Sequence, residues 1–184
     1  YEIAACLVGS EMCIRDRGKL NPSYEQCESG EEQSPINLKW SKPQKSGEIE
    51  FKYTTQPLSM INNGHTIQVN VSPGSYAMIR GKRYELIQYH FHSQSEHTIG
   101  NKYFPLEIHF VHKNEEGKLA VVGVMYKIGN KNEALQSILE NMPKRSGENF
   151  ITQEITFNPL YLLPNTLTSV SYTHLRAHET GRNL

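Results

Sequence analysis

The sequence predicts a predominantly β protein with a central twisted, mostly antiparallel sheet and few short helices. Between residues 48 and 128, one short segment after another is rich in β-branched, aromatic and aliphatic residues, which is typical of strands. Only residues 132–141 space their apolar side chains as an amphipathic helix does. A length of 184 residues is that of about one domain and allows a substantial core.

The predicted strands follow one another with short connections. Residues 22–35 are polar and rich in turn formers, so we expect a surface loop there. Residues 66–71 alternate, with three branched side chains on one face. A hairpin turn is expected at Gly81-Lys82. In order, the strand candidates of this half are 48–53, 58–62, 66–71, 76–80 and 84–92.

The second half of the chain adds one long strand and the helix. Residues 118–128 form a long apolar run, which predicts a strand of the buried type. In residues 132–141, helical spacing gathers Ala134, Leu135, Ile138 and Leu139 on one side. The helix is therefore expected to pack with this side against the sheet.

Composition excludes some classes of partner. The 19 Lys and Arg residues balance the 19 Asp and Glu residues, so nothing indicates a nucleic acid or a membrane surface. No apolar run approaches the roughly 20 residues that a membrane-spanning helix needs. We expect neither nucleic-acid binding nor a membrane span.

The pattern richest in chemistry lies on two predicted strands. On the first, Gln88, His90 and His92 share one face, because successive side chains of a strand point to opposite faces. On the second, which is predicted over residues 106–111, Glu107 and His109 share a face for the same reason. If the two strands pair, three imidazoles converge on one surface. Three neutral nitrogen ligands without a thiolate are the composition of a catalytic zinc site with an open fourth position.

The simpler alternative is that His90 and His92 are an ordinary, partly exposed pair on a strand. The amide of Gln88 and the carboxylate of Glu107 favour the metal site, because metal-bound histidines usually donate their other N–H to such groups. His97 and His112 are interpreted as structural, because in the alternation neither lies on the ligand face.

Seven blocks of sequence, in order and with plausible spacing, resemble the α-class carbonic anhydrases across roughly residues 18–167. Residues 18–20, Cys27 and residues 33–35 look most like the bacterial secreted members of that family. The resemblance implies a zinc cofactor, a predominantly β fold and a small-molecule substrate, carbon dioxide or bicarbonate. The seven blocks are residues 33–38, 62–65, 88–92, 95–98, 107–112, 119–124 and 162–164.

The two ends do not share this resemblance. Residues 1–17 and 168–184 look like translated sequencing adapters, so we expect a non-native leader and a non-native tail around a partial domain at 18–167. The domain is then expected to be incomplete at its C-terminus, with later strands of the sheet missing and strand edges unpaired.

Mapped residue by residue, the resemblance places three zinc ligands at His90, His92 and His109. It makes Gln88 and Glu107 the groups that orient these ligands, since a carboxylate that accepts an imidazole N–H raises the basicity of the ligand.

The same mapping gives five further positions. His65 takes the place of the family's proton shuttle, a role that suits a side chain titrating near neutral pH. Asn63 and Gln68 would line the polar side of the cavity, and Val121 would form part of its apolar wall. Glu96 matches a glutamate that is paired, in the family, with a threonine on a later segment.

That threonine is not found after the 162–167 segment, so Glu96 is expected to lack its family partner. The disulfide partner that secreted relatives often give Cys27 is not found either, so we expect a free thiol.

The function implied is the reversible hydration of carbon dioxide by zinc-bound hydroxide, in a periplasmic or secreted protein. No signal peptide is recognised in this sequence. Whether this chain alone is active stays open, and so do two alternatives. One is a non-catalytic binding module of the same fold. The other, more distant, is a cupin-type metalloenzyme, since His90, His92 and Glu96 fit the first half of the cupin metal motif while the expected downstream glycines are missing.

Overall fold

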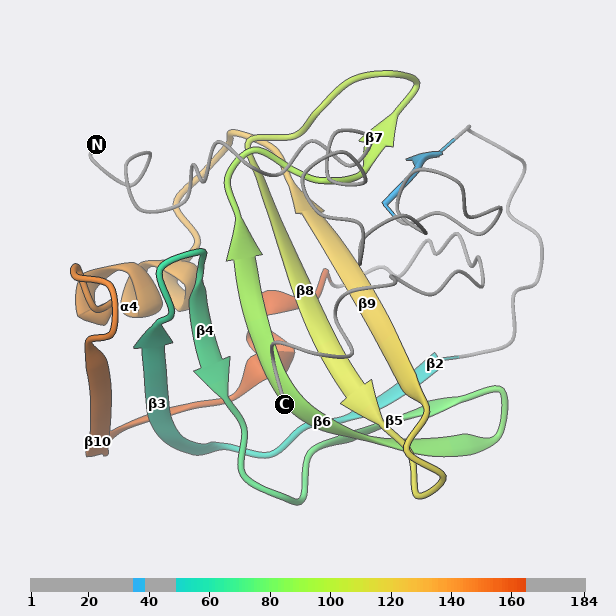
Figure 1. Cartoon of the computed structure of the whole chain (residues 1–184), viewed down its shortest axis with the longest axis horizontal. Coiled ribbons are helices and arrows are strands. Elements are labelled where there is room, and N and C mark those ends of the chain that lie inside the picture. The colour runs from blue at the N-terminus through green and yellow to red at the C-terminus, as the bar shows by residue number, and fades with distance from the viewer. Residues whose placement is uncertain (1–34, 39–48, 165–184) are drawn as a thin grey trace, which may run out of the picture.

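The computed structural model describes residues 35–38 and 49–164, and eight of its strands form one large sheet (Figure 1). All but the last residue of the expected surface loop at 22–35, together with Cys27 and both expected non-native ends, lies outside the described residues. The sheet consists of β2 (Ile49–Lys52), β3 (Gln56–Asn62), β4 (Ile67–Asn70), β5 (Tyr76–Ile79), β6 (Lys82–His92), β8 (Leu106–Lys113), β9 (Leu119–Tyr126) and β10 (Asn149–Phe157).

The long strand β6 organises the sheet. One edge of β6 pairs with β5 along its first part and with β4 along its last part, while β8 pairs along the opposite edge. The order β10-β3-β4-β6-β8-β9 therefore runs across the sheet, and β5 and β2 continue it beside the start of β6. All these pairs are antiparallel. A separate parallel pair joins β1 (Asn37–Leu38) to β7 (Thr98–Ile99).

A register shift in β6 decides which side chains reach which face. Leu86 pairs with His112 and Gln88 with Val111, so β6 carries one residue more than β8 between these two pairs. Such a bulge changes the face to which the following side chains point. Leu86 and Tyr89 therefore both lie in the apolar core, while Gln88 and the residues in step with it lie on the opposite face.

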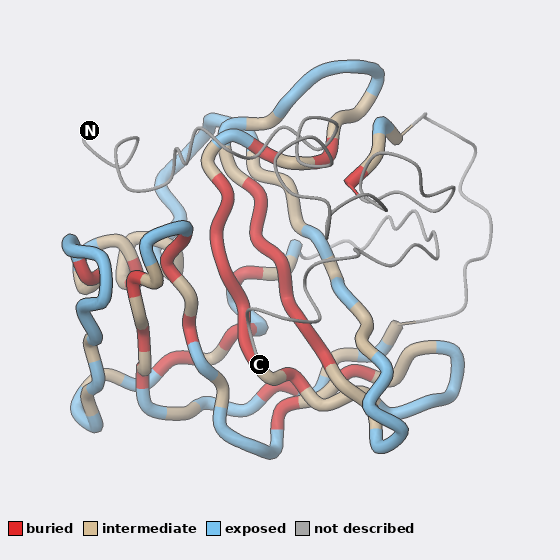
Figure 2. Tube along the Cα trace, in the orientation of Figure 1, coloured by how far each residue is buried: buried red, intermediate tan, exposed pale blue. Residues whose placement is uncertain are grey.

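The apolar core covers one face of the sheet. Tyr89 and Phe110, on neighbouring strands, are each at most 1% exposed, and their rings stack with centroids 5.4 Å apart. The last part of β6 and nearly all of β8 are the most continuously buried segments of the sheet (Figure 2). The site described below lies on the other face of these same two strands, so the core fixes its backbone.

The helix α4 (Glu133–Asn141) begins at a side-chain cap. The Oδ1 atom of Asn132 accepts a hydrogen bond from the Leu135 N–H at 3.0 Å, which satisfies one of the donors left open at a helix start. Ile138 is 1% exposed and belongs to the core, so the helix packs on the sheet as its spacing predicts. A short 3₁₀ helix, η2 (Pro159–Leu162), follows β10, and the Tyr126 hydroxyl donates to the Leu162 carbonyl at 2.6 Å.

The predicted fold class is confirmed, and three local predictions need correction. The hairpin turn is Arg80-Gly81 rather than Gly81-Lys82, because Ile79 pairs with Lys82 and both turn residues have a positive φ, as a type I′ turn requires. The strand β9 is not buried: among the described residues it pairs only with β8, and Val121 is 45% exposed. The strand β10 was not predicted from the sequence.

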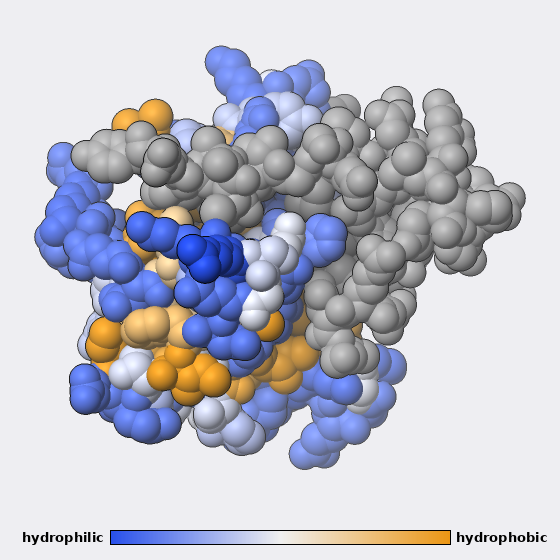
Figure 3. Space-filling view, turned by 60° about the vertical axis from the view of Figure 1, so that its left-hand side comes forward, coloured by the Kyte–Doolittle hydropathy of each residue, from blue (hydrophilic) through white to orange (hydrophobic). Residues whose placement is uncertain are grey.

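The surface near β10 carries exposed apolar side chains. Ile151 of β10 is 70% exposed and Leu160 of η2 is 41% exposed. Viewed from the side that carries β10, apolar patches stand out between hydrophilic ones (Figure 3). None of the helices in residues 35–38 and 49–164 is long and apolar enough to cross a bilayer.

Candidate metal centre

The histidines meet because β6 and β8 pair in the predicted way. His90 lies directly opposite His109, and His92 lies directly opposite Glu107. Residues directly opposite in an antiparallel pair project to the same face. The three imidazoles are buried, with exposures of 4%, 6% and 4% for His90, His92 and His109.

The three rings form a compact cluster. Their centroids lie 4.8 Å apart for His90 and His92, 5.3 Å for His90 and His109, and 4.5 Å for His92 and His109. Each ring offers one nitrogen, either Nδ1 or Nε2, and these three nitrogens all lie within 4.8 Å of one another. This spacing and the neutral nitrogen donors fit one divalent cation with three protein ligands.

Hydrogen bonds fix which ring nitrogen carries the proton. The Oε1 atom of Gln88 lies 2.9 Å from Nδ1 of His90, and a carbonyl oxygen can only accept, so His90 carries its proton on Nδ1 and its lone pair on Nε2. The Oε1 atom of Glu107 lies 2.9 Å from Nε2 of His109, so the lone pair of His109 is on Nδ1. Such partners orient imidazoles toward a metal.

Glu107 is a fully buried carboxylate that accepts four hydrogen bonds. Oε1 accepts from His109 and, at 2.6 Å, from Nδ1 of His97, while Oε2 accepts from the backbone N–H groups of Glu96 at 2.8 Å and His97 at 3.0 Å. Burial by itself would raise the pKa of Glu107, but the hydrogen bonds from His109 and His97 outweigh it and hold that pKa well below its usual range. Glu107 is therefore ionised and held in place.

The carboxylate of Glu96 lies beside the same cluster. Its Oε2 atom is 3.6 Å from Nε2 of His92 and 3.7 Å from Nδ1 of His109, and its side chain is 4% exposed. A buried carboxyl group is thus close to two of the nitrogens that would bind a cation.

His97 is part of the site, which corrects its interpretation from the sequence. The alternation failed there because β6 ends at His92 and the chain leaves the sheet before it reaches His97. From this loop the ring of His97 comes within 5.7 Å of the His109 ring, between centroids. His97, Glu107 and His109 could themselves surround a cation, but their atoms already hydrogen-bond to one another.

His112 lies on the core face, away from the cluster. Its Nε2 accepts from the Tyr53 hydroxyl at 2.7 Å, and Nδ1 faces the Ala120 carbonyl at 3.3 Å. Burial lowers the pKa of His112 to about 4, so the ring is neutral at pH 7. Its position agrees with a structural role.

The four remaining candidates lie on β4, on β9 or in the loop before β4. His65 is exposed and lies two residues before β4, and the Asn63 side chain accepts from the backbone N–H groups of His65 and Thr66 at 3.0 and 2.9 Å. Gln68 lies opposite His90, on the same face of the sheet. Val121 shares a face with Gly123, which lies opposite His109. All four are compatible with the surroundings of a site at the histidines.

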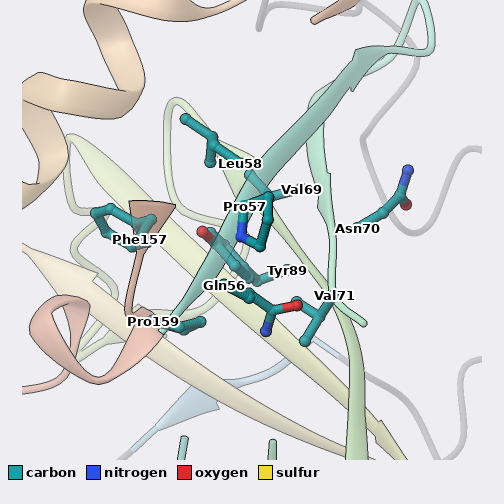
Figure 4. A pocket seen from close by; sticks show the side chains of 9 residues that line it. All are labelled: Gln56, Pro57, Leu58, Val69, Asn70, Val71, Tyr89, Phe157 and Pro159. Carbon is teal, nitrogen blue, oxygen red and sulfur yellow. The ribbon is translucent and has the colours of Figure 1, made fainter. Parts of the chain in front are cut away.

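A pocket elsewhere offers no alternative site. It is lined by nine residues around β3, β4 and η2, among them Leu58, Val69 and Tyr89 (Figure 4), and none of the three histidines lines it. Its volume of about 10 Å³ is room for about one water molecule.

Comparison with known proteins identifies the family. Residues 17–175 match the family model described as eukaryotic-type carbonic anhydrase. A carbonic anhydrase of Pectobacterium carotovorum is 41% identical over 128 residues, which cover 70% of this chain and 52% of that protein. The chain thus spans about half the length of the curated relatives it matches.

Solved structures agree. A hyperthermostable carbonic anhydrase from an active hydrothermal vent chimney has a TM-score of 0.74 at 39% identity, covering 83% of this chain and 68% of that one. The α-carbonic anhydrase of Thermovibrio ammonificans, solved in complex with the inhibitor sulfanilamide, has a TM-score of 0.76 at 35% identity, covering 82% and 67%. This chain belongs to the eukaryotic-type, or α-class, carbonic anhydrase family.

Proposed function

We propose that His90, His92 and His109 bind one zinc ion, and that the whole protein catalyses the reversible hydration of carbon dioxide to bicarbonate and a proton. The buried cluster of three imidazoles, two of them with their tautomers set by Gln88 and Glu107, carries this proposal. Three neutral nitrogen donors suit zinc.

Zinc in such a site lowers the pKa of a water molecule to about 7 and so supplies hydroxide to carbon dioxide at neutral pH, an effect for which carbonic anhydrase is itself the reference case. The protein's own groups would do the rest. Gln88 and Glu107 keep the lone pairs of His90 and His109 on the nitrogens that bind the ion. Glu96 offers a buried hydrogen-bond acceptor beside the cluster.

The reaction also needs a proton to leave and a place for the substrate. We assign the proton transfer to His65, which is exposed and near β4, so that it can reach both the site and the solvent. Asn63 and Gln68 would hold water on the polar side, and Val121 would form part of an apolar wall for carbon dioxide.

Zinc content tests the ligand set. We expect one zinc per chain after dialysis against a weak chelator, and no stoichiometric zinc in a His109→Ala variant, because two imidazoles alone bind the ion too weakly. A His65→Ala variant is the matched control and should keep its zinc. Tight zinc retained by His109→Ala would refute the assignment.

Carbon dioxide hydration tests the role of His65. In the whole protein, His65→Ala should slow turnover at low buffer concentration and leave zinc content unchanged, because only proton export is impaired. Buffers that carry protons themselves should restore the rate. An unchanged rate at low buffer would remove His65 from the mechanism.

Zinc binding without any hydration by the whole protein would instead indicate the non-catalytic module. The family match decides against a cupin. We further propose a periplasmic or secreted location and a domain at 18–167, by similarity to bacterial relatives. Fractionation of cells that express the whole gene tests the location.

A further inference from the structure

Gly123 stands in the middle of β9, between Val122 and Val124. It lies directly opposite His109, on the face that carries the histidine cluster. A glycine in a strand interior weakens the strand and often marks a close approach by another group. Here that group can be named.

A Cβ atom at position 123 would lie 2.8 Å from Oε1 of Glu107, and 3.6 and 3.8 Å from Cδ2 and Nε2 of His109. A contact below 3.0 Å forces one partner to move. Glu107 cannot move without loss, since its carboxylate is fully buried and accepts four hydrogen bonds, including the one from Nε2 of His109. The space beside Gly123 is therefore the space that the carboxylate uses.

We propose that Gly123 is a positioning residue of the metal centre: the missing side chain lets the Glu107 carboxylate reach Nε2 of His109, so that His109 presents Nδ1 to the metal. Glu107 lies opposite Met125, two residue pairs along β8 and β9 from His109 and Gly123, so its side chain has to lean towards position 123 to make this contact. This inference rests on the proposed function only in taking the ion bound at the histidines to be zinc.

The first test uses metal-free protein. In the wild type, ¹⁵N NMR of the imidazoles should show His109 with its proton on Nε2. In Gly123→Ala the Glu107 contact is displaced, so His109 should show a mixture of tautomers. Gly129→Ala is the matched control, because a Cβ there meets no heavy atom within 4 Å among the described residues. An unchanged His109 tautomer in Gly123→Ala would overturn the inference.

The second test is a double-mutant cycle on zinc affinity, measured by competition with a chelator. Gly123→Ala should weaken zinc binding about 10–100-fold, the range typical of losing such a partner. In a Glu107→Ala background the added methyl group meets no carboxylate, so Gly123→Ala should cost no further affinity there. Independent, multiplicative losses would show that Gly123 does not act through Glu107.

The folding of the variants also distinguishes a clash with the Glu107 carboxylate from a requirement of the β9 backbone for glycine. If Gly123→Ala fails to fold while the Glu107→Ala/Gly123→Ala double variant folds, the clash with the carboxylate is the cause and the inference is supported. If both fail to fold, the glycine serves the backbone of β9 and the inference is wrong. A wild type that binds no zinc would refute the proposed function, yet the tautomer measurement would still decide the role of Gly123.

Discussion

The burial of His112 makes the stability of the fold depend on pH. Burial lowers the pKa of His112 from 6.5 to about 4, whereas in the unfolded chain the ring regains its ordinary value. Between pH 6.5 and about 4, the unfolded state therefore binds a proton that the folded state does not. The free energy of unfolding must therefore fall as the pH falls through this window. The contribution of His112 to it is fully present above the window.

The magnitude follows from the two pKa values. A pKa shift of 2.5 is worth about 3 kcal/mol once the pH is below both values, and about 2 kcal/mol of that is lost by pH 5. Urea unfolding followed by circular dichroism at pH 7.5 and pH 5 measures the loss. Other groups titrate too, so the informative quantity is the wild type compared with His112→Gln, whose amide can replace the hydrogen bonds without titrating.

We expect His112→Gln to lose about 2 kcal/mol less than the wild type between these two pH values. Tyr53→Phe is the control: burial rather than the Tyr53 hydroxyl is the first cause of the low pKa, so this variant should keep most of the pH dependence. Equal pH dependence in His112→Gln and the wild type would refute the reasoning.

Two further changes test the metal centre and the helix. Glu107→Gln should weaken zinc binding about 10–100-fold, as measured by competition with a chelator. The reason is that an amide cannot accept all four hydrogen bonds without turning an N–H toward a donor. Unchanged zinc affinity would contradict the orienting role of Glu107. Asn132→Ala should lower the free energy of unfolding, measured in urea, by about 1 kcal/mol, because the Leu135 N–H loses its acceptor. The control Lys131→Ala removes an exposed ion pair and should lower that free energy by well under this amount. Equal losses in the two variants would contradict the capping argument.

The part of the site that could be predicted from the sequence depends on strand alternation. Because a strand has a period of two, Gln88, His90 and His92 had to share a face once they lay on one strand. Their pairing with His109 was a condition of the prediction, and the structure supplies it through the antiparallel pairing of β6 with β8. Nothing in the sequence marked the bulge after Leu86, yet that bulge puts Leu86 on the core face and the histidines of β6 on the opposite face.

The predictions from the sequence failed where a strand ends, so that alternation no longer applies, or where the burial of a strand depends on whether a neighbouring strand pairs with it. His97 lies beyond the end of β6, so no strand period could place its ring against Glu107. The apolar run of β9 looked buried because composition shows how apolar a strand is, but not how many neighbours it has; among the described strands it has one. The strand β10 was missed for a related reason: its exposure alternates, and it is recognisable as a strand by its pairing with β3.

Metal binding and catalysis make different demands on this chain. All three proposed ligands lie on two strands that pair with each other, and the core behind those strands is formed by residues that the structure describes. Zinc binding therefore tests the β6–β8 pairing and its supports, Gln88 and Glu107. Turnover would demand more, since the proposed mechanism assigns proton export to His65 and part of the substrate wall to Val121, both outside these two strands. A chain that binds zinc tightly but turns over slowly would place the deficit in those surroundings and leave the metal centre intact.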